Sequence, residues 1–259
     1  MLHQPRKRFG QHFLIDASVL QAIVDALALQ STDNVVEIGP GLGALTADLL
    51  TKLNQLTVIE IDRDLAQQMK KKFEPSKLTV YNEDALSFNF STLSQKPGDM
   101  RVVGNLPYNI STPLLFHLFD HQECIRDMHF MLQKEVVLRL TADIGSADYG
   151  RLSVMSQYFC DNILLFLVDA DAFDPPPKVE SAVVQLIPKK NLPLSPVEFT
   201  IFANVVKEAF NYRRKKLSNS IKRLIDSETL IALGIDPNTR PQDTSVAEYC
   251  RIAQAISLK

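Results

Sequence analysis

The stretch Asn105-Leu106-Pro107-Tyr108 places an amide and an aromatic ring directly after 101–104, an apolar segment typical of a buried strand. In an open α/β sheet the ligand crevice lies beyond the carboxyl ends of the strands. There an Asn side-chain oxygen can accept a hydrogen bond from an amine, and a Tyr ring can stack on a flat base. The stretch therefore indicates chemistry on an amino group of a nucleobase, although an ordinary proline turn has the same pattern.

A second pattern, in residues 35–44, indicates a strand, a glycine-rich turn and the start of a helix. Gly39 and Gly41 allow the backbone to turn tightly and to approach a ligand closely. Glu60 ends the next apolar segment, about 20 residues after the turn, where a carboxylate can bind ribose hydroxyls. Both a dinucleotide and an adenosyl ligand contain such a ribose. Asp84, after a third predicted strand, and Asn105, after a fourth, favour S-adenosylmethionine over a nicotinamide.

Apolar periodicity predicts the elements that must position these residues. Strands are expected at 34–38, 56–60, 77–81 and 101–104, alternating with helices at 18–29, 43–53, 63–73 and 111–120. This βα repeat is typical of a mainly parallel sheet. Further apolar runs at 126–132, 162–169 and 180–187 would complete seven strands.

The pattern of residue types changes after Pro188. A linker rich in Lys and Pro is followed by segments with helical periodicity, expected at 196–210, 213–225, 227–233 and 245–257. We therefore expect an α/β domain over 1–188, with a basic N-terminal segment over 1–17, and a small all-helical domain over 196–259.

Composition is that of an intracellular globular enzyme. With 259 residues, 46% of them apolar, the chain can bury a large core. Its three cysteines form no C-x-x-C pair, so a disulfide framework is not expected. Neither a signal-peptide pattern nor an apolar run of membrane-spanning length occurs, so we expect a cytoplasmic protein without a membrane partner.

Charge is unevenly distributed along the chain. The net charge is −2, but residues 189–259 hold 12 Lys or Arg against 7 Asp or Glu, a net charge of +5. Basic residues also cluster, and such clusters are either solvated helix faces or phosphate-binding patches. Because an enzyme that works on a base must hold the surrounding backbone, we expect a nucleic-acid-binding role for Arg6, Lys7, Arg8, Arg213, Arg214, Lys215, Lys216, Lys222 and Arg223.

Motifs spread over most of the chain carry a resemblance to a known family. They are Arg6–Leu14, the glycine turn, Glu60, Asp84, Asn105–Tyr108, Phe173–Ser181 and Phe210–Leu217. The chain resembles the ribosomal RNA adenine dimethyltransferases, specifically the bacterial branch that acts on 16S RNA. The resemblance implies a Rossmann-like class I methyltransferase fold with its last strand antiparallel, S-adenosylmethionine as cofactor, and a monomer that acts on a pre-assembled small-subunit particle.

The same resemblance implies how the cofactor is held. His12 and Leu14 would contact its amino-acid end, Gly39 and Gly41 would approach the methionine part, and Asp84 would accept from the adenine amine. Many relatives have Asn where this chain has His12. A contact made by the backbone of this residue would not be affected by that difference.

The resemblance also implies the catalytic residues. The Asn105 side-chain oxygen and the Leu106 carbonyl would accept hydrogen bonds from the target amine, within a turn stiffened by Pro107. Tyr108 would stack on the target adenine, and Phe173 is the candidate for its opposite face. The remaining interpretation of Phe173 is a core aromatic before a proline turn.

Other classes of function stay open as alternatives. A large-subunit (23S) adenine methylase of the antibiotic-resistance type would share the catalytic core, and a ribosome-assembly factor would depend on binding more than on catalysis. A nicotinamide dehydrogenase would share the glycine turn. No metal is expected: His117 and His121 have helical i, i+4 spacing, but no third ligand completes the pattern.

Overall fold

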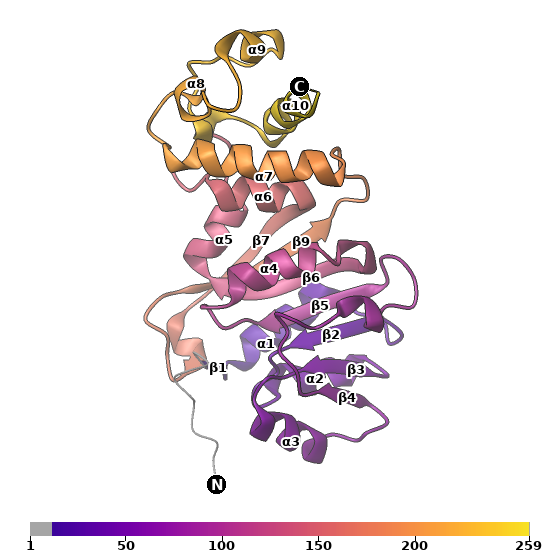
Figure 1. Cartoon of the computed structure of the whole chain (residues 1–259). Coiled ribbons are helices and arrows are strands. Elements are labelled where there is room, and N and C mark those ends of the chain that lie inside the picture. Colours follow the sequence, from indigo (N-terminus) through magenta and orange to yellow (C-terminus); the bar gives the residue numbers. More distant parts are fainter. Residues whose placement is uncertain (1–11, 259) are drawn as a thin grey trace. The chain divides into compact units, whose positions relative to one another are not determined.

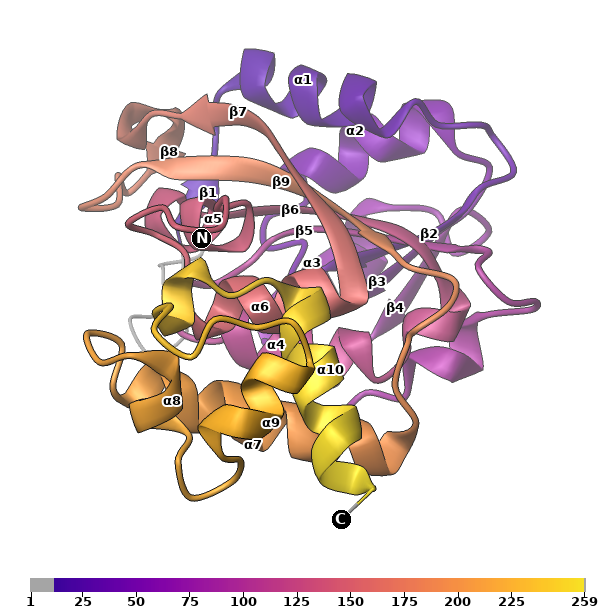
Figure 2. The same ribbon diagram turned by 90° about the horizontal axis from the view of Figure 1, so that it is seen from above.

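The computed structural model describes residues 12–258, which form two compact units (Figures 1 and 2). The first unit comprises 12–137 and 163–188, and the second comprises 138–162 and 189–258. The second unit thus includes 138–162, which the sequence pattern assigned to the α/β domain. That segment contains one helix and the end of another, and apolar periodicity revealed neither of them.

A seven-stranded sheet forms the centre of the α/β fold, in the order β4-β3-β2-β5-β6-β9-β7 (Figure 1). The strands are β2 (Asn34–Ile38), β3 (Leu56–Ile59), β4 (Leu78–Tyr81), β5 (Met100–Asn105), β6 (Ile125–Gln133), β7 (Cys160–Val168) and β9 (Ser181–Pro188). The pairs from β4 to β6 are all parallel, and β6 pairs with β9 antiparallel. The predicted mainly parallel sheet, with its last strand antiparallel, is confirmed.

Four helices of the first unit flank this sheet. They are α1 (Ala17–Leu27), α2 (Ala44–Lys52), α3 (Arg63–Lys72) and α4 (Ser111–Phe119). Apolar side chains of α1, α2 and α3 share one core cluster with one face of the strands. Figure 2 shows α4 on the opposite side of the sheet from α1 and α2. Because both faces are covered, the strands are apolar almost throughout, which is why their positions are readable from sequence.

A small antiparallel pair, β1 (Phe13–Leu14) with β8 (Phe173–Asp174), was not predicted. Two residues are too short a run to show alternation. The pairing matches Phe13 with Asp174 and Leu14 with Phe173, so it joins segments far apart in the chain.

The second unit contains the remaining helices. They are α6 (Arg151–Phe159), α7 (Pro196–Asn211), α8 (Leu217–Ser220), α9 (Ser227–Ala232) and α10 (Val246–Ser257), with α5 (Lys134–Leu140) spanning the boundary between the units. Short 3-10 helices span Phe90–Leu93, Gln122–Cys124, Ala170–Ala172 and Pro241–Asp243. Ser195 and Ser245 begin α7 and α10 with capping boxes, which explains why these two boundaries agree with the pattern.

The helix predicted over 213–225 is much shorter in the structure. A turn closed by the Lys215 amide on the Tyr212 carbonyl, at 2.8 Å, separates α7 from α8. α8 then contains two serines and an asparagine, whose side chains compete for backbone hydrogen bonds and disfavour long helices. No helix within residues 12–258 is long and apolar enough to cross a membrane.

Close packing of β5 against β2 depends on Gly104. A Cβ built at this position would lie 2.5 Å from the backbone oxygen of Ile38. A flexible side chain could move away from such a contact, but the backbone of Ile38 cannot. The ends of β5 and β2 therefore approach each other this closely only because residue 104 is glycine.

We expect Gly104→Ala to destabilise the protein by about 1–3 kcal/mol, because the added methyl overpacks a buried backbone contact. Urea unfolding measures the change. Gly150→Ala is the matched control, since a Cβ there would meet its nearest neighbour at an ordinary 3.8 Å. Equal stability losses for the two variants would contradict this explanation.

A buried charge network lies at the opposite ends of the strands. Arg101 donates to both carboxylate oxygens of Asp127 at 2.9 Å and to Asp33 at 3.0 Å. His129 is 1% exposed, and neither of its ring nitrogens has a hydrogen-bond partner within the described residues. Burial, the largest cause, lowers the pKa of His129 to about 4.

This histidine makes stability depend on pH. An unfolded imidazole has a pKa of about 6.5, so between pH 6.5 and 4 the unfolded chain binds the additional proton, and stability is lost as pH falls. We expect the stability difference between wild type and His129→Leu to fall by about 2 kcal/mol from pH 7 to pH 5. Urea unfolding of both proteins at each pH tests this, and a pH-independent difference would contradict it.

Candidate active site

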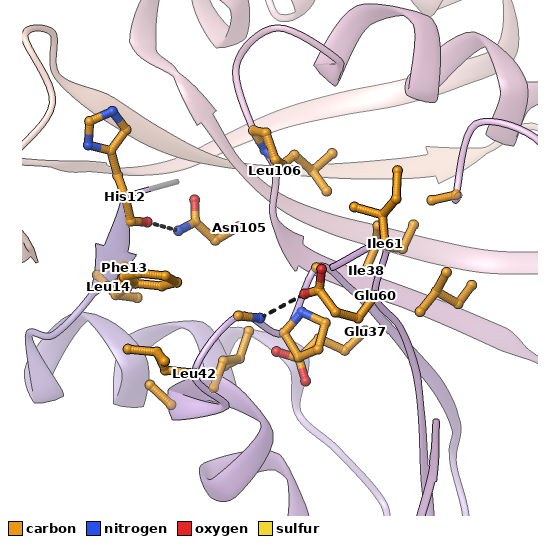
Figure 3. Close-up of a pocket in the computed structure, with 18 of the residues that line it drawn as sticks. His12, Phe13, Leu14, Glu37, Ile38, Leu42, Glu60, Ile61, Asn105 and Leu106 are labelled. Atoms are coloured by element: carbon orange, nitrogen blue, oxygen red, sulfur yellow. Dashed lines mark hydrogen bonds between the residues drawn. The ribbon is translucent and has the colours of Figure 1, made fainter. Parts of the chain in front are cut away.

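A cavity of about 470 Å³ opens at the carboxyl ends of β2, β3 and β5 in the first unit (Figure 3). The structure brings together here nearly all residues predicted for cofactor and base binding. They are His12, Leu14, Gly39, Gly41, Glu60, Asp84, Asn105, Leu106, Pro107 and Tyr108. The register explains this convergence, because Glu37 pairs with both Val58 and Val103 and the three strands end side by side.

The glycine turn forms the floor of the cavity. Gly39, Gly41 and Gly43 have φ values of 67°, 56° and 76°, which L side chains rarely adopt. A Cβ on Gly39 would meet nothing within 4 Å, so a ligand can approach its backbone. Gly43 is the N-cap residue of α2 and has no side chain to cap the helix, which leaves the first amides of α2 available to a ligand. The turn therefore fits the methionine part of an adenosyl cofactor.

Glu60 is held rigidly at the end of β3. Its Oε1 accepts from the Asp62 amide at 2.8 Å, and its Oε2 accepts from the Gly41 amide at 3.3 Å. Burial, the first cause, raises its pKa, and the Asp62 carboxylate contributes in the same direction. Carboxylate oxygens have further lone pairs, so Glu60 can still accept from ribose hydroxyls.

Asp84 lies in the loop after β4 and is exposed. Its Oδ1 accepts from the Leu86 amide at 2.9 Å, which fixes the direction of the carboxylate. The second oxygen can accept from an exocyclic amine.

Asn105 is oriented by the N-terminal segment. Its Nδ2 donates to the backbone carbonyl of His12 at 3.2 Å, as Figure 3 shows. That bond uses the donor end of the amide and leaves the side-chain oxygen as the acceptor. The next residue is anchored as well, because the Leu106 amide donates to the Met131 carbonyl at 3.1 Å. A hydrogen-bond acceptor for an amine is thus fixed at the end of β5.

Tyr108 is half-buried and held at both ends. Its hydroxyl lies 2.7 Å from the Ser181 hydroxyl. The His12 ring lies nearly parallel to the Tyr108 ring, with centroids 6.0 Å apart, and the His12 Nδ1 lies 2.8 Å from the Pro175 carbonyl oxygen. Burial raises the pKa of Tyr108, so the ring stays neutral. A neutral, fixed aromatic ring suits stacking on a base.

Known proteins resemble the chain over nearly its whole length. The family model described as "Ribosomal RNA adenine dimethylase" matches residues 2–258. The chain belongs to the ribosomal RNA adenine dimethylase family.

Individual relatives of this dimethylase family agree. The chain is 56% identical over 254 residues to "Ribosomal RNA small subunit methyltransferase A" of Coxiella burnetii (strain CbuG_Q212), covering 97% of this chain and 98% of the relative. It is 51% identical over 257 residues to the protein of the same name from Escherichia coli (strain 55989 / EAEC), covering 98% and 94%. The crystal structure of a dimethyladenosine transferase from Plasmodium falciparum matches with a TM-score of 0.83 and 27% identity, covering 95% and 98%. The predicted Rossmann-like methyltransferase fold is confirmed.

Phe173 is the site prediction that does not reach the cavity of this dimethylase family member. Its side chain is 3% exposed and packs in the core cluster of the first unit. Pairing with Leu14 in the β1–β8 ladder turns the ring inward. In this structure Phe173 therefore packs as a core aromatic and does not line the cavity.

The predicted RNA-binding residues of the second unit are all exposed. Arg213 donates to Gln242 and to the Ala147 carbonyl, and Lys216 donates to Asn238. Because these acceptors carry no charge, the positive charges are not neutralised. Arg6, Lys7 and Arg8 lie outside the described residues.

Glu37, in the strand that precedes the glycine turn, also lines the cavity. It is 2% exposed, and its Oε2 accepts from the Thr46 hydroxyl at 2.6 Å. Burial is the main cause that raises the pKa of Glu37 to about 8, and the Glu60 charge adds to it. The sequence signal for a site residue at this position was a carboxylate near the end of an apolar strand.

His117 and His121, the pair with helical spacing, have other partners in the structure. No group of three or more His, Cys, Asp or Glu side chains in the part of the chain that the structure describes could hold an ion. His117 Nε2 lies 2.8 Å from the Phe88 carbonyl, and His121 Nδ1 lies 3.0 Å from the Ser91 hydroxyl. These histidines thus have structural partners.

A double-mutant cycle tests how Tyr108 is held. We expect Tyr108→Phe and Ser181→Ala each to cost about 1 kcal/mol, with a coupling of about 0.5–1.5 kcal/mol in the double variant, because both remove one hydrogen bond. Urea unfolding gives the free energies. Ser111→Ala is the control, since Ser111 donates to the Tyr108 backbone carbonyl and its effect should add to that of Tyr108→Phe. Additive losses in the Ser181 cycle would show that the hydroxyls do not interact.

Proposed function

We propose that this chain is an S-adenosylmethionine-dependent enzyme that dimethylates N6 of two adjacent adenines in the 3′-terminal hairpin of 16S ribosomal RNA. The observation that carries the proposal is the fixed acceptor of Asn105, which lies in the same cavity as the ribose-binding carboxylate Glu60. Membership of the ribosomal RNA adenine dimethylase family supports adenine as the target. The names of the bacterial relatives support the small subunit.

The hydrogen-bond donors and acceptors that line the cavity match those of the cofactor. The Gly39 backbone and the uncapped start of α2 suit the methionine part, Glu60 suits the ribose, and Asp84 suits the adenine amine. His12 and Leu14 lie at the N-terminal wall of the same cavity. Once bound there, the cofactor supplies an electrophilic methyl group on a sulfonium.

The chain's own task is to position the nucleophile. An adenine amine is a poor nucleophile, because its lone pair is delocalised into the ring. Hydrogen bonds from the amine to the Asn105 oxygen and the Leu106 carbonyl would favour a tetrahedral nitrogen with a directed lone pair. No strong base is required, and correct orientation alone can lower a barrier by roughly 7–11 kcal/mol.

Tyr108 holds the target base by stacking. Stacking on an aromatic side chain is worth about 1–3 kcal/mol per base, which offsets part of the cost of extracting an adenine from its stack. Because Phe173 packs in the core, Tyr108 is the aromatic residue that we propose for this contact.

The surrounding RNA is held by basic residues. Arg213, Arg214, Lys215 and Lys216, with Lys222 and Arg223, are exposed in the second unit and suit phosphate contacts that release counterions. We propose a cytoplasmic monomer that recognises the RNA within a pre-assembled small-subunit particle.

Methyl transfer to unmethylated small subunits tests the proposal. Labelled S-adenosylmethionine should yield dimethyladenosine in nucleoside digests of the 16S RNA. We expect Asn105→Ala to reduce kcat by about 100-fold or more, because the amine loses its orientation. Asn109→Ala is the matched control, since Asn109 lines the same cavity from the turn that follows and should retain near-normal activity. Label appearing only in large-subunit RNA, or full activity of Asn105→Ala, would refute the proposal.

A further inference from the structure

Glu37 has no task in the transfer proposed above, although it lines the cavity. The residue is 2% exposed, and the partner described for its carboxyl group is the neutral hydroxyl of Thr46. Thr46 itself is fully buried. A carboxyl group placed away from water without a cationic partner favours its neutral form.

The charges that line the cavity are mostly negative. Titratable side chains face it from before β1, from the ends of β2 and β3, from the end of α3 and from the loop after β4. In that order they are His12, Glu37, Glu60, Lys72, Glu83 and Asp84, and Tyr108 faces the cavity from the turn after β5. Lys72 donates to the Leu42 carbonyl at 3.0 Å. Because Glu60 is the charge that acts on Glu37, the surroundings oppose ionisation of Glu37 until a cation enters.

The proposed cofactor brings such a cation. S-adenosylmethionine carries a sulfonium and an ammonium against one carboxylate. The thioether that remains after methyl transfer lacks the sulfonium charge. An acidic, partly dry cavity therefore interacts differently with the cofactor before and after transfer, since Coulomb interactions are strong at low dielectric.

We infer that Glu37 releases its proton to solvent when S-adenosylmethionine binds, and releases it to a much smaller extent when the thioether product binds, so that this residue discriminates cofactor from product by charge. The O–H bond of the carboxylic acid breaks, the proton passes to the buffer, and no electrons are exchanged. This inference rests on the proposed function and adds a residue that determines cofactor specificity.

Proton release on binding is measured directly by calorimetry. The full-length protein is titrated with S-adenosylmethionine at pH 7 in phosphate and in Tris, whose ionisation enthalpies differ. The slope of binding enthalpy against ionisation enthalpy gives the protons exchanged. A group with a pKa of about 8 is about nine-tenths protonated at pH 7, so we expect release of about 0.9 proton per cofactor. With S-adenosylhomocysteine we expect less than half of that.

Two variants identify the source of the proton. Glu37→Gln mimics the neutral acid, can still accept from Thr46, and should bind S-adenosylmethionine with no proton release from this position. Its preference for S-adenosylmethionine over the thioether should fall at least about fivefold. Glu83→Gln is the matched control for the proton release: Glu83 lines the same cavity but is exposed, so the variant should release the same number of protons as wild type.

The pH dependence of affinity gives a second measurement. Because binding to wild type is coupled to the loss of about one proton, wild type should bind S-adenosylmethionine about tenfold more tightly at pH 7 than at pH 6. Glu37→Gln should lack this contribution. If circular dichroism shows that Glu37→Gln does not fold, the inference is still tested by wild type alone. The test is then the buffer dependence of its binding enthalpy with S-adenosylmethionine and with S-adenosylhomocysteine.

Each outcome has one meaning. Binding without buffer dependence, equal release with both ligands, or full release by Glu37→Gln would overturn the inference and leave the proposed function intact. No binding of S-adenosylmethionine and no methyl transfer by wild type would overturn the proposed function itself.

Discussion

The whole site depends on how closely β5 lies against β2. Gly104 has no side chain, and the backbone oxygen of Ile38 occupies the space that a Cβ would need. With the strands in this register, the glycine turn that follows β2 and the amide that follows β5 open into one cavity. A shift of one strand against the other would separate the groups proposed to hold a cofactor from those proposed to hold a base.

Segments far apart in the sequence complete the walls around this contact. The His12 carbonyl fixes the Asn105 amide, and the Ser181 hydroxyl holds Tyr108. In each case the side chain proposed to contact the base is held by a residue outside its own strand. The orientation that the proposed chemistry requires is therefore supplied by the tertiary structure rather than by the Asn-Leu-Pro-Tyr turn alone.

Much of the fold was readable from sequence for a physical reason. Parallel strands buried on both faces are continuous apolar runs, and serine capping boxes mark α7 and α10. Two helices escaped prediction: α5 follows β6 without a break, and α6 begins after Gly150, which has no side chain to form a cap. The direction in which a side chain points was harder to predict from sequence. Phe173 illustrates this, because it lies in a two-residue strand, which is too short to show periodicity.

The pairing of β1 with β8 also constrains how the protein can be made. Phe13 and Leu14 are synthesised early, but their partners Asp174 and Phe173 follow about 160 residues later. During translation the pairing of β1 with β8, which forms the N-terminal wall of the cavity, therefore cannot occur until most of the chain has left the ribosomal tunnel. Closing such a distant contact is slow because of the entropy of the long intervening loop, so this wall of the cavity forms late in the folding of each new polypeptide.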